Sequence, residues 1–371
     1  MRQYRPDLVH VQNWHGKHKY NRQSAYGSAL DYLDQRGNDL AVSIKHVAAK
    51  AGVSIATVSH VLNGTRGTRT ATRDRVLEAI QELGYSQNQA ARNLARGRSS
   101  FLGLIISDIR NPFFPDITSG FQDQALAHNM DALVLNTNYD SDRTLAAVRR
   151  LAGLQVPGVA ILTSQIDPAV ADLLPNSGVA SVFLDLGRVD RNISNIVVDY
   201  EHGISQALEH LAGLGHTHIG YIGGPLALPS AQVRKKAFMD SAVRAGIEPG
   251  RTIDADFTVK GGYNACAQLL AGSRPTAIMT GNDLTAIGVL HCAFDQGLRV
   301  PTDLSVVGFD DILFSEHTHP ALTTVAVPRG QIGNVAFEAL WAMMNDADHM
   351  GREYRVETHL VVRKSTLPRQ R

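Results

Sequence analysis

The sequence predicts a small all-α unit near the N-terminus, followed by a large α/β region with parallel sheets in two lobes. Three observations favour this class. Hydrophobic residues make up 44% and charged residues 19% of the 371 residues, as in globular proteins of more than one domain. Between residues 43 and 84, apolar residues recur with helical spacing. From Phe101 onward, short apolar runs alternate with amphipathic segments.

The N-terminal unit is expected to contain three short helices. The first, at about residues 44–51, follows the N-cap Ser43 and stops at Gly52, where a left-handed residue is needed. The second, at about 55–62, follows the capping residue Ser54, and the third spans about 70–83. A tight glycine-centred turn between the first two predicts a helix-turn-helix. The residues expected to face its core are Val58, Val61, Leu62, Val76, Leu77, Ile80 and Leu83.

The large region is expected to form parallel sheets covered by helices, because its strands are apolar along their whole length. Its length allows one sheet or two, and we favour two similar lobes. The expected strands are 102–106, 132–135, 159–162, 182–184, 196–198, 218–222, 277–279 and 304–307, with 322–327 and 358–362 as crossings or edge strands.

The net charge of +1 conceals an uneven distribution. The formal charge is +2 over residues 1–42, +6 over residues 43–99 and −7 over the rest. A basic segment joined to an acidic one favours a polyanion as partner of the basic part. The alternative is a charged helix face that contacts only water.

Several protein classes find no support in the sequence. No apolar run approaches the ~18 residues of a membrane span, and residues 1–20 have no apolar core of a secretory signal. We therefore expect a cytoplasmic protein with no membrane partner. Cys266 and Cys292 form neither a disulfide framework nor a CxxC pair.

No catalytic constellation is recognisable either. The motifs GxxxxGK[ST], HExxH and GxSxG are absent, and Gly223-Gly224-Pro225 lacks dinucleotide-loop spacing. His317-Thr318-His319 has no identifiable third metal ligand. We expect no enzyme activity, no cofactor and no metal.

Residues 43–85 resemble the DNA-binding headpiece of the lactose/galactose repressor family. The specific runs are AGVSIATVSHVLNG at 51–64 and RVLEAIQELGY at 75–85. The resemblance continues through NPFF at 111–114, TGND at 280–283, VGFDD at 307–311 and PALTTV at 320–325, and it covers about residues 43–365.

The resemblance implies that the second helix of the headpiece enters the major groove of double-stranded DNA. It assigns base reading to Ile55, Ala56 and His60, and phosphate contacts to Ser54, Thr57, Ser59 and Asn63. The alternative is that these are ordinary exposed helix residues.

Residues 86–100 match the hinge of the family. The resemblance implies that Asn88 and Arg92 contact DNA and that Leu94 wedges into the central base step of the minor groove. Gln87 stands where the family usually has proline, so we expect a less pre-organised hinge. The alternative is a plain charged linker.

The large region resembles a two-lobed periplasmic-type binding fold with its ligand between the lobes. The effector-binding residues that this implies are Phe113, Phe114, Ser164, Arg234, Phe257, Asn282 and Asp283. Arg234 and Asp283 are favoured as the central pair; the alternatives are a salt bridge between the lobes or a helix N-cap. Phe113 and Phe114 could instead belong to the core.

Together, these features predict a homodimeric transcription regulator, and a repressor is favoured. It would bind a pseudo-palindromic operator under control of a small effector, a sugar or sugar derivative, and associate with the nucleoid when bound to DNA. A purine-type corepressor or a solute-binding protein without regulatory role are the alternatives. The expected segments are an extension (1–42), the headpiece (43–85), the hinge (86–100), the two-lobed domain (101–365) and a tail (366–371).

Overall fold

The computed structural model describes residues 42–64, 67–85, 99–272, 274–346 and 350–369, with the side chains of Asn63, Pro168, Pro175 and Asn176 excepted. The chain divides into two compact units, Met1–Arg92 and Asn93–Arg371. The expected N-terminal extension and almost all of the expected hinge lie outside the described residues.

The described residues of the first unit, 42–64 and 67–85, form a headpiece with the helices α2 (Ile44–Ala51), α3 (Ile55–Asn63) and α4 (Thr70–Leu83). Gly52 has a φ of 62°, as its place at the helix end requires. Ser54 Oγ accepts a hydrogen bond from the Thr57 amide at 3.1 Å and so caps α3. The predicted helices are therefore confirmed.

The core of the headpiece is centred on one valine from each helix. Val47, Val58 and Val76 are fully buried. The prediction that Leu77 faces this core is wrong, since Leu77 is 45% exposed. Ala79 is buried instead, because it lies three residues after Val76 on the same face of α4.

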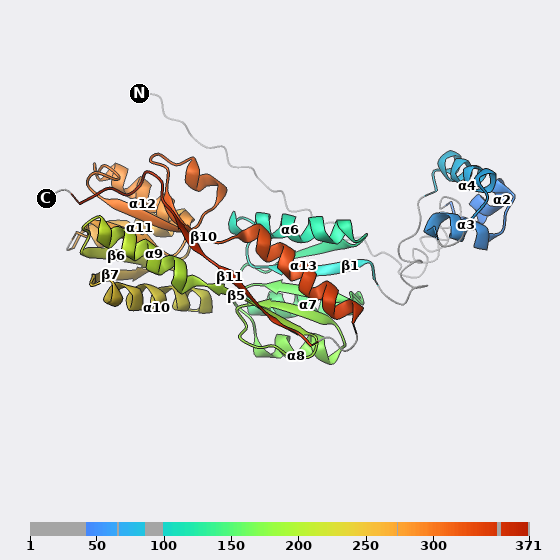
Figure 1. Cartoon of the computed structure of the whole chain (residues 1–371), viewed down its shortest axis with the longest axis horizontal. Helices are drawn as coiled ribbons and strands as arrows, with labels where there is room; N and C mark the ends of the chain where they lie inside the picture. Colours follow the sequence, from blue (N-terminus) through green and yellow to red (C-terminus); the bar gives the residue numbers. More distant parts are fainter. Residues whose placement is uncertain (1–41, 65–66, 86–98, 273, 347–349, 370–371) are drawn as a thin grey trace, which may run out of the picture. The chain divides into compact units, whose positions relative to one another are not determined.

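The second unit has two lobes, which Figure 1 shows. In the described residues, each lobe contains one six-stranded sheet. The first sheet has the order β11-β5-β4-β3-β1-β2, and the second has the order β12-β10-β9-β8-β6-β7. All pairings are parallel except that of β10 with β12, which is antiparallel. The expected parallel, two-lobed architecture is confirmed.

The strands of the first sheet are β1 (Phe101–Ile106), β2 (Asp131–Asn136), β3 (Gly158–Leu162), β4 (Ala180–Leu184), β5 (Ile193–Asp199) and β11 (Glu353–Glu357). Those of the second are β6 (His218–Gly223), β7 (Glu248–Asp254), β8 (Ala277–Thr280), β9 (Ser305–Asp310), β10 (Thr323–Ala326) and β12 (His359–Val361). The strands β7 and β11 were not predicted from the sequence. Both lie at a sheet edge and carry several exposed polar residues, so they lack an apolar run.

Helices cover both sheets. The first lobe has α6 (Phe113–Ala127), α7 (Ser141–Gly153), α8 (Pro168–Asn176) and α13 (Arg329–Asn345). The second has α9 (Tyr200–Gly213), α10 (Pro229–Arg244), α11 (Val259–Leu270), α12 (Asp283–Asp295) and the 3₁₀ turn η1 (Leu313–Glu316). Within the described ranges, we find no helix with the length and apolar character to span a membrane.

The chain crosses between the lobes after β5, after β10 and after β11. Thr358 joins the first and third crossings: its Oγ1 donates to the Asp199 carbonyl oxygen at 2.6 Å and accepts from the Gly203 amide at 3.0 Å. Because Thr358 is fully buried, these two crossings form one hydrogen-bonded unit behind the space between the lobes.

The tight packing of α11 against α12 can be tested at Gly288. A Cβ there would lie 2.1 Å from the Val259 carbonyl oxygen and 2.6 Å from the Tyr263 amide nitrogen. We expect Gly288→Ala to lower the free energy of unfolding by about 1–3 kcal/mol, because two backbones must separate. Gly213→Ala, at a helix end with open space, should be neutral or slightly stabilising. Urea unfolding measures both, and equal effects would contradict the packing argument.

Candidate DNA-binding surface and ligand pocket

The exposed side of α3 carries the residues predicted to read bases. Ile55 is 45% exposed and Ala56 is exposed, whereas His60 is half-buried. Since Val58 anchors the opposite side of the helix, α3 has the inner and outer faces that a groove-reading helix needs.

The predicted phosphate-contacting residues are placed in part. Ser54 is exposed, and its hydroxyl oxygen lies 2.9 Å from the hydroxyl oxygen of Thr57. Ser59 is half-buried. The side chain of Asn63, and the predicted hinge residues Asn88, Arg92 and Leu94, lie outside the described part of the chain. Their assignment stays a prediction.

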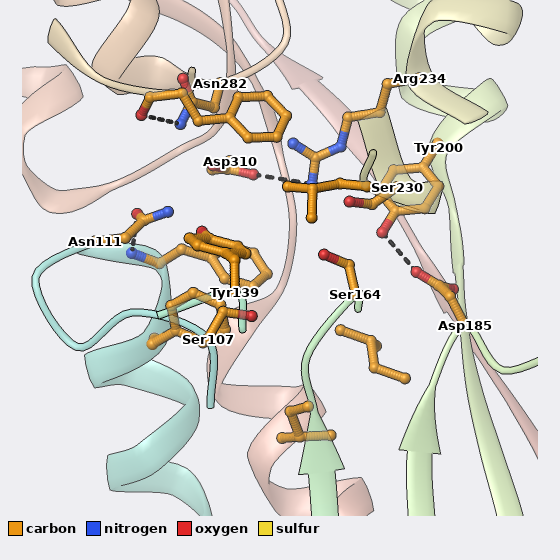
Figure 2. A pocket seen from close by; sticks show the side chains of 16 residues that line it. Ser107, Asn111, Tyr139, Ser164, Asp185, Tyr200, Ser230, Arg234, Asn282 and Asp310 are labelled. Atoms are coloured by element: carbon orange, nitrogen blue, oxygen red, sulfur yellow. Dashed lines mark hydrogen bonds and ion pairs between the residues drawn. The ribbon is translucent and has the colours of Figure 1, made fainter. Parts of the chain in front are cut away.

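A pocket lies between the two lobes of the second unit, and Figure 2 shows its side chains. Its walls follow the carboxyl ends of parallel strands, where ligands bind in α/β folds. The first lobe contributes Ser107, Asn111, Phe113, Phe114, Tyr139, Leu162, Ser164, Leu184 and Asp185. The second contributes Tyr200, Leu228, Ser230, Arg234, Phe257, Asn282 and Asp310.

The free volume of the pocket is small. It encloses about 50 Å³, far below the ~300–1,000 Å³ of ordinary ligand pockets. Phe113 and Phe114, at the start of α6, form part of its wall with rings 5.2 Å apart and edge to face. Both phenylalanines are buried, at 8% and 5% exposure, so they belong to the core and to the pocket wall together.

Arg234 on α10 is the cation at the centre of the pocket. Its guanidinium lies 4.4 Å from the ring centre of Phe309 and 4.9 Å from that of Tyr200. It donates to the Gly281 carbonyl oxygen at 2.7 Å and lies 3.5 Å from Asp310 Oδ1. Burial opposes its charge, but Asp310 and the nearby tyrosines outweigh burial and raise the pKa of Arg234.

The acidic partner of Arg234 is Asp310, at the end of β9. Burial raises the pKa of Asp310 to about 6, against the opposing effect of Arg234 and Arg329. Asp310 Oδ1 and Arg234 Nε have no hydrogen-bond partner among the described residues. Two buried polar atoms beside the pocket are therefore left for a ligand or water to satisfy.

A second carboxylate bridges the lobes. Asp185, after β4, accepts hydrogen bonds from the Tyr200 hydroxyl at 2.6 Å and from the Val198 amide at 3.0 Å. Burial raises the pKa of Asp185 despite these bonds. Tyr200 is the first residue of α9, so this contact lies where the chain crosses into the second lobe.

Asp283, predicted together with Arg234 as an effector-binding residue, is not among the residues that line the pocket. Asn282, the residue before it, lines the pocket and caps α12 by accepting from the Thr285 amide at 2.9 Å. Asp283 itself accepts from the Ile312 amide at 2.9 Å and from the hydroxyls of Ser315 and Thr324, both at 2.6 Å. It joins α12 to the segments after β9 and before β10, and its part in effector binding stays a prediction.

The other predicted effector residues line the pocket: Phe113, Phe114, Ser164, Arg234, Phe257 and Asn282. The sequence analysis overlooked Tyr139, Asp185, Tyr200, Ser230 and Asp310 as pocket residues, together with Ser107 and Asn111. Ser107, Asp185 and Asp310 stand at or directly after the ends of apolar strands. That position was the available signal, because the carboxyl ends of parallel strands meet at one edge.

Two sequence profiles match the chain. The profile described as "Bacterial regulatory proteins, lacI family" matches residues 43–88. The profile described as "Periplasmic binding protein-like domain" matches residues 208–366.

Curated proteins and solved structures resemble most of the chain. Catabolite control protein A of Priestia megaterium is 34% identical over 308 residues, which are 82% of this chain and 93% of that protein. The HTH-type transcriptional repressor PurR of Photobacterium profundum is 33% identical over 327 residues, with coverage of 87% and 98%. A structure of the Lac repressor dimer bound to operator and the anti-inducer ONPF has a TM-score of 0.78 and 29% identity, covering 88% of this chain and 99% of that one.

The role of Asp283 can be tested through the pH dependence of stability. Burial, followed by the charge of Asp310, raises the pKa of Asp283 to about 7, above the ~3.9 of an unfolded aspartate. The folded state then binds the proton more tightly than the unfolded chain does. The contribution of Asp283 to the free energy of unfolding is therefore complete below about pH 4 and is lost as the pH rises through about 7. We expect the free energy of unfolding to fall over this range, and to fall less in Asp283→Asn.

A matched control is Asp303. Hydrogen bonds from Arg299 lower the pKa of Asp303 to about 2. The contribution of Asp303 to the free energy of unfolding is lost only as the pH falls toward about 2. Asp303→Asn should therefore leave the slope of the free energy of unfolding against pH unchanged above about pH 5. Urea unfolding across the pH range measures both variants. A slope in Asp283→Asn equal to that of the unaltered chain would contradict the assignment.

Proposed function

Because the chain belongs to the lacI family of bacterial regulatory proteins, we propose that it is a DNA-binding transcriptional repressor controlled by a small molecule held between its lobes. The proposal is carried by two features found in one chain: a headpiece with a groove-reading helix, and an interlobe pocket in which Arg234 Nε and Asp310 Oδ1 have no hydrogen-bond partner. It would act in the cytoplasm, associated with the nucleoid when bound to DNA.

The DNA partner is a pseudo-palindromic operator bound by a homodimer. One reader helix is a small footprint, and two copies related by two-fold symmetry read two half-sites. The Lac repressor of similar structure was solved as a dimer on its operator. We assign base reading to Ile55, Ala56 and His60, and phosphate contacts to Ser54, Thr57, Ser59 and Asn63. Asn88, Arg92 and Leu94 belong to the hinge part of the same interface.

The effector is an uncharged molecule rich in hydroxyl groups, such as a sugar. Two carboxylates and one guanidinium line the pocket, and the guanidinium is already paired with Asp310. A phosphate would lie beside Asp185 and Asp310 with no second cation among the lining residues. Hydroxyl groups, in contrast, can donate to Asp310 Oδ1 and accept from Arg234 Nε together.

The pocket supports binding rather than catalysis. No histidine, cysteine or lysine is among its lining residues, all of which the structure describes. The hydroxyl of Ser107 donates to that of Thr163 at 2.9 Å and so has no general base as its acceptor. A solute-binding protein without regulatory role would have no use for the headpiece.

The reader helix can be tested by a matched pair of substitutions. Ile55 and Leu77 are both 45% exposed on the headpiece, on α3 and α4 respectively. With an operator selected from genomic DNA, we expect Ile55→Ala to weaken specific binding by about 1–3 kcal/mol, as one lost base contact predicts. Leu77→Ala should leave affinity unchanged.

Fluorescence anisotropy at several salt concentrations measures these affinities. Affinity for both variants and for the unaltered chain should fall steeply with salt, because basic side chains release counterions from DNA. A flat salt response, or equal losses for the two alanine variants, would argue against α3 as the reader.

The effector class can be tested by calorimetry with a panel of neutral sugars, their phosphates and purine bases. We expect a neutral sugar to bind and to change operator affinity, and its phosphate to bind at least about tenfold more weakly. Arg234→Lys should weaken that binding because a lysine cannot donate in two fixed directions, whereas Arg244→Lys, exposed on the same helix, should not. Tighter binding of a sugar phosphate would overturn the charge argument, and binding of purines alone would replace the sugar.

A further inference from the structure

Arg329 occupies a special place in the chain path. It is the first residue of α13, directly after the chain crosses from the second lobe into the first. Its side chain is only 12% exposed although it is charged. A buried guanidinium needs several acceptors, and those of Arg329 come from both lobes.

On the side of the second lobe, Arg329 holds the backbone at the end of β9. Its Nη1 donates to the carbonyl oxygens of Asp310 and Asp311. These two residues have φ values of 109° and 54°, a region that non-glycine residues rarely adopt. Such a backbone persists only where surrounding contacts hold it, and Arg329 supplies two of them. The side chain of Asp310 lies in the ligand pocket.

On the side of the first lobe, Arg329 binds the start of α6. Its Nε donates to Asp116 Oδ2 at 2.9 Å, and its Nη2 lies 2.7 Å from the same oxygen. Asp116 is in the first turn of α6, beside the pocket residues Phe113 and Phe114. Arg329 therefore connects the backbone of one pocket wall with the helix that carries the opposite wall.

The helices α6 and α13 make a rigid support for this contact. A Cβ at Gly333 would lie 2.2 Å from the Ile117 carbonyl oxygen, and one at Gly120 would lie 2.6 Å from the Gly330 carbonyl oxygen. The two backbones thus touch directly, and Asp116 keeps its position relative to Arg329. The movable contact of Arg329 is the one with the second lobe.

We propose that Arg329 is an interlobe clamp, which fixes the Asp310–Asp311 turn of the second lobe to α6 of the first and so holds the pocket closed. A ligand that draws Asp310 toward itself would move the same turn, and the clamp would transmit that movement to α6. This second step rests on the proposed effector function, whereas the closure itself does not.

The clamp is tested by measuring the distance between the lobes in the full chain. Spin labels on Asp142→Cys in α7 and Lys260→Cys in α11, both exposed positions, report this distance by double electron–electron resonance. The natural Cys266 and Cys292 are buried and should not react. An excess of unlabelled chain keeps one labelled copy in each oligomer.

We expect one dominant short distance in the unaltered chain. Arg329→Met should add a longer distance, with the closed-to-open ratio falling about tenfold, as the loss of charge-assisted hydrogen bonds predicts. Asp116→Asn, at a half-exposed position that should not endanger folding, should shift the ratio in the same direction by a smaller factor. Arg329→Lys should give a closed-to-open ratio between those of Arg329→Met and Asp116→Asn, because lysine keeps the charge but is a single point charge.

Arg363 provides the matched control. Its Nη1 donates to the Leu322 carbonyl oxygen at 2.9 Å and lies 2.7 Å from Asp311 Oδ1. It thus binds the same turn and is similarly buried, at 19% exposure, but both of its partners belong to the second lobe. Arg363→Met should leave the distance distribution unchanged.

The proposal is overturned if Arg329→Met and Asp116→Asn, both folded by circular dichroism, give the distribution of the unaltered chain. It is also overturned if Arg363→Met opens the lobes as much as Arg329→Met does. Neither effector nor operator enters the measurement, so the clamp can fail while the regulatory function stands. Conversely, a chain that binds no DNA can still show the clamp.

Discussion

The arrangement of the pocket residues in the second lobe depends on the burial of one cation, Arg234. A guanidinium at 9% side-chain exposure is stable only if its surroundings replace water. The replacements are the Asp310 carboxylate, the Gly281 carbonyl oxygen and three aromatic ring faces. They come from β9, from the end of β8 and from segments near α9 and α11, so the cation is satisfied only when several strands of the second sheet end at the same edge.

The same residue, Asp310, joins this charge to the backbone geometry. Its carboxylate faces Arg234, and its carbonyl oxygen accepts from Arg329 while its φ is 109°. The two arginines therefore hold one aspartate from opposite sides, one through the side chain and one through the main chain. A change in how the pocket holds the carboxylate must alter the strain in the turn or the contact with Arg329. This makes Asp310 the point where ligand chemistry and lobe arrangement meet.

The sequence was sufficient for the headpiece and for most strands because both leave local signals. Ser54 and Gly52 mark the ends of helices by their own side-chain and backbone preferences, and buried parallel strands appear as apolar runs. The edge strands β7 and β11 leave no such run. Asn282 and Asp283 differ by one position at a helix start, yet only the first faces the pocket. Which of the two side chains faces the pocket depends on how α12 packs against β9 and β10, and the local sequence pattern does not encode this packing.

The chain connectivity limits how the pocket can influence the headpiece. Among the described elements, β1 is the next after α4, and the pocket residues Ser107 and Phe113 follow it in the chain, at the start of the first lobe. The second lobe is joined to this region only by the crossings and by contacts such as those of Asp185 with Tyr200 and of Arg329 with Asp310. In the proposed function, a ligand held by Arg234 and Asp310 would act on the first lobe by changing how the second lobe is held against it. On this proposal, the contacts between the lobes would set the size of the regulatory response.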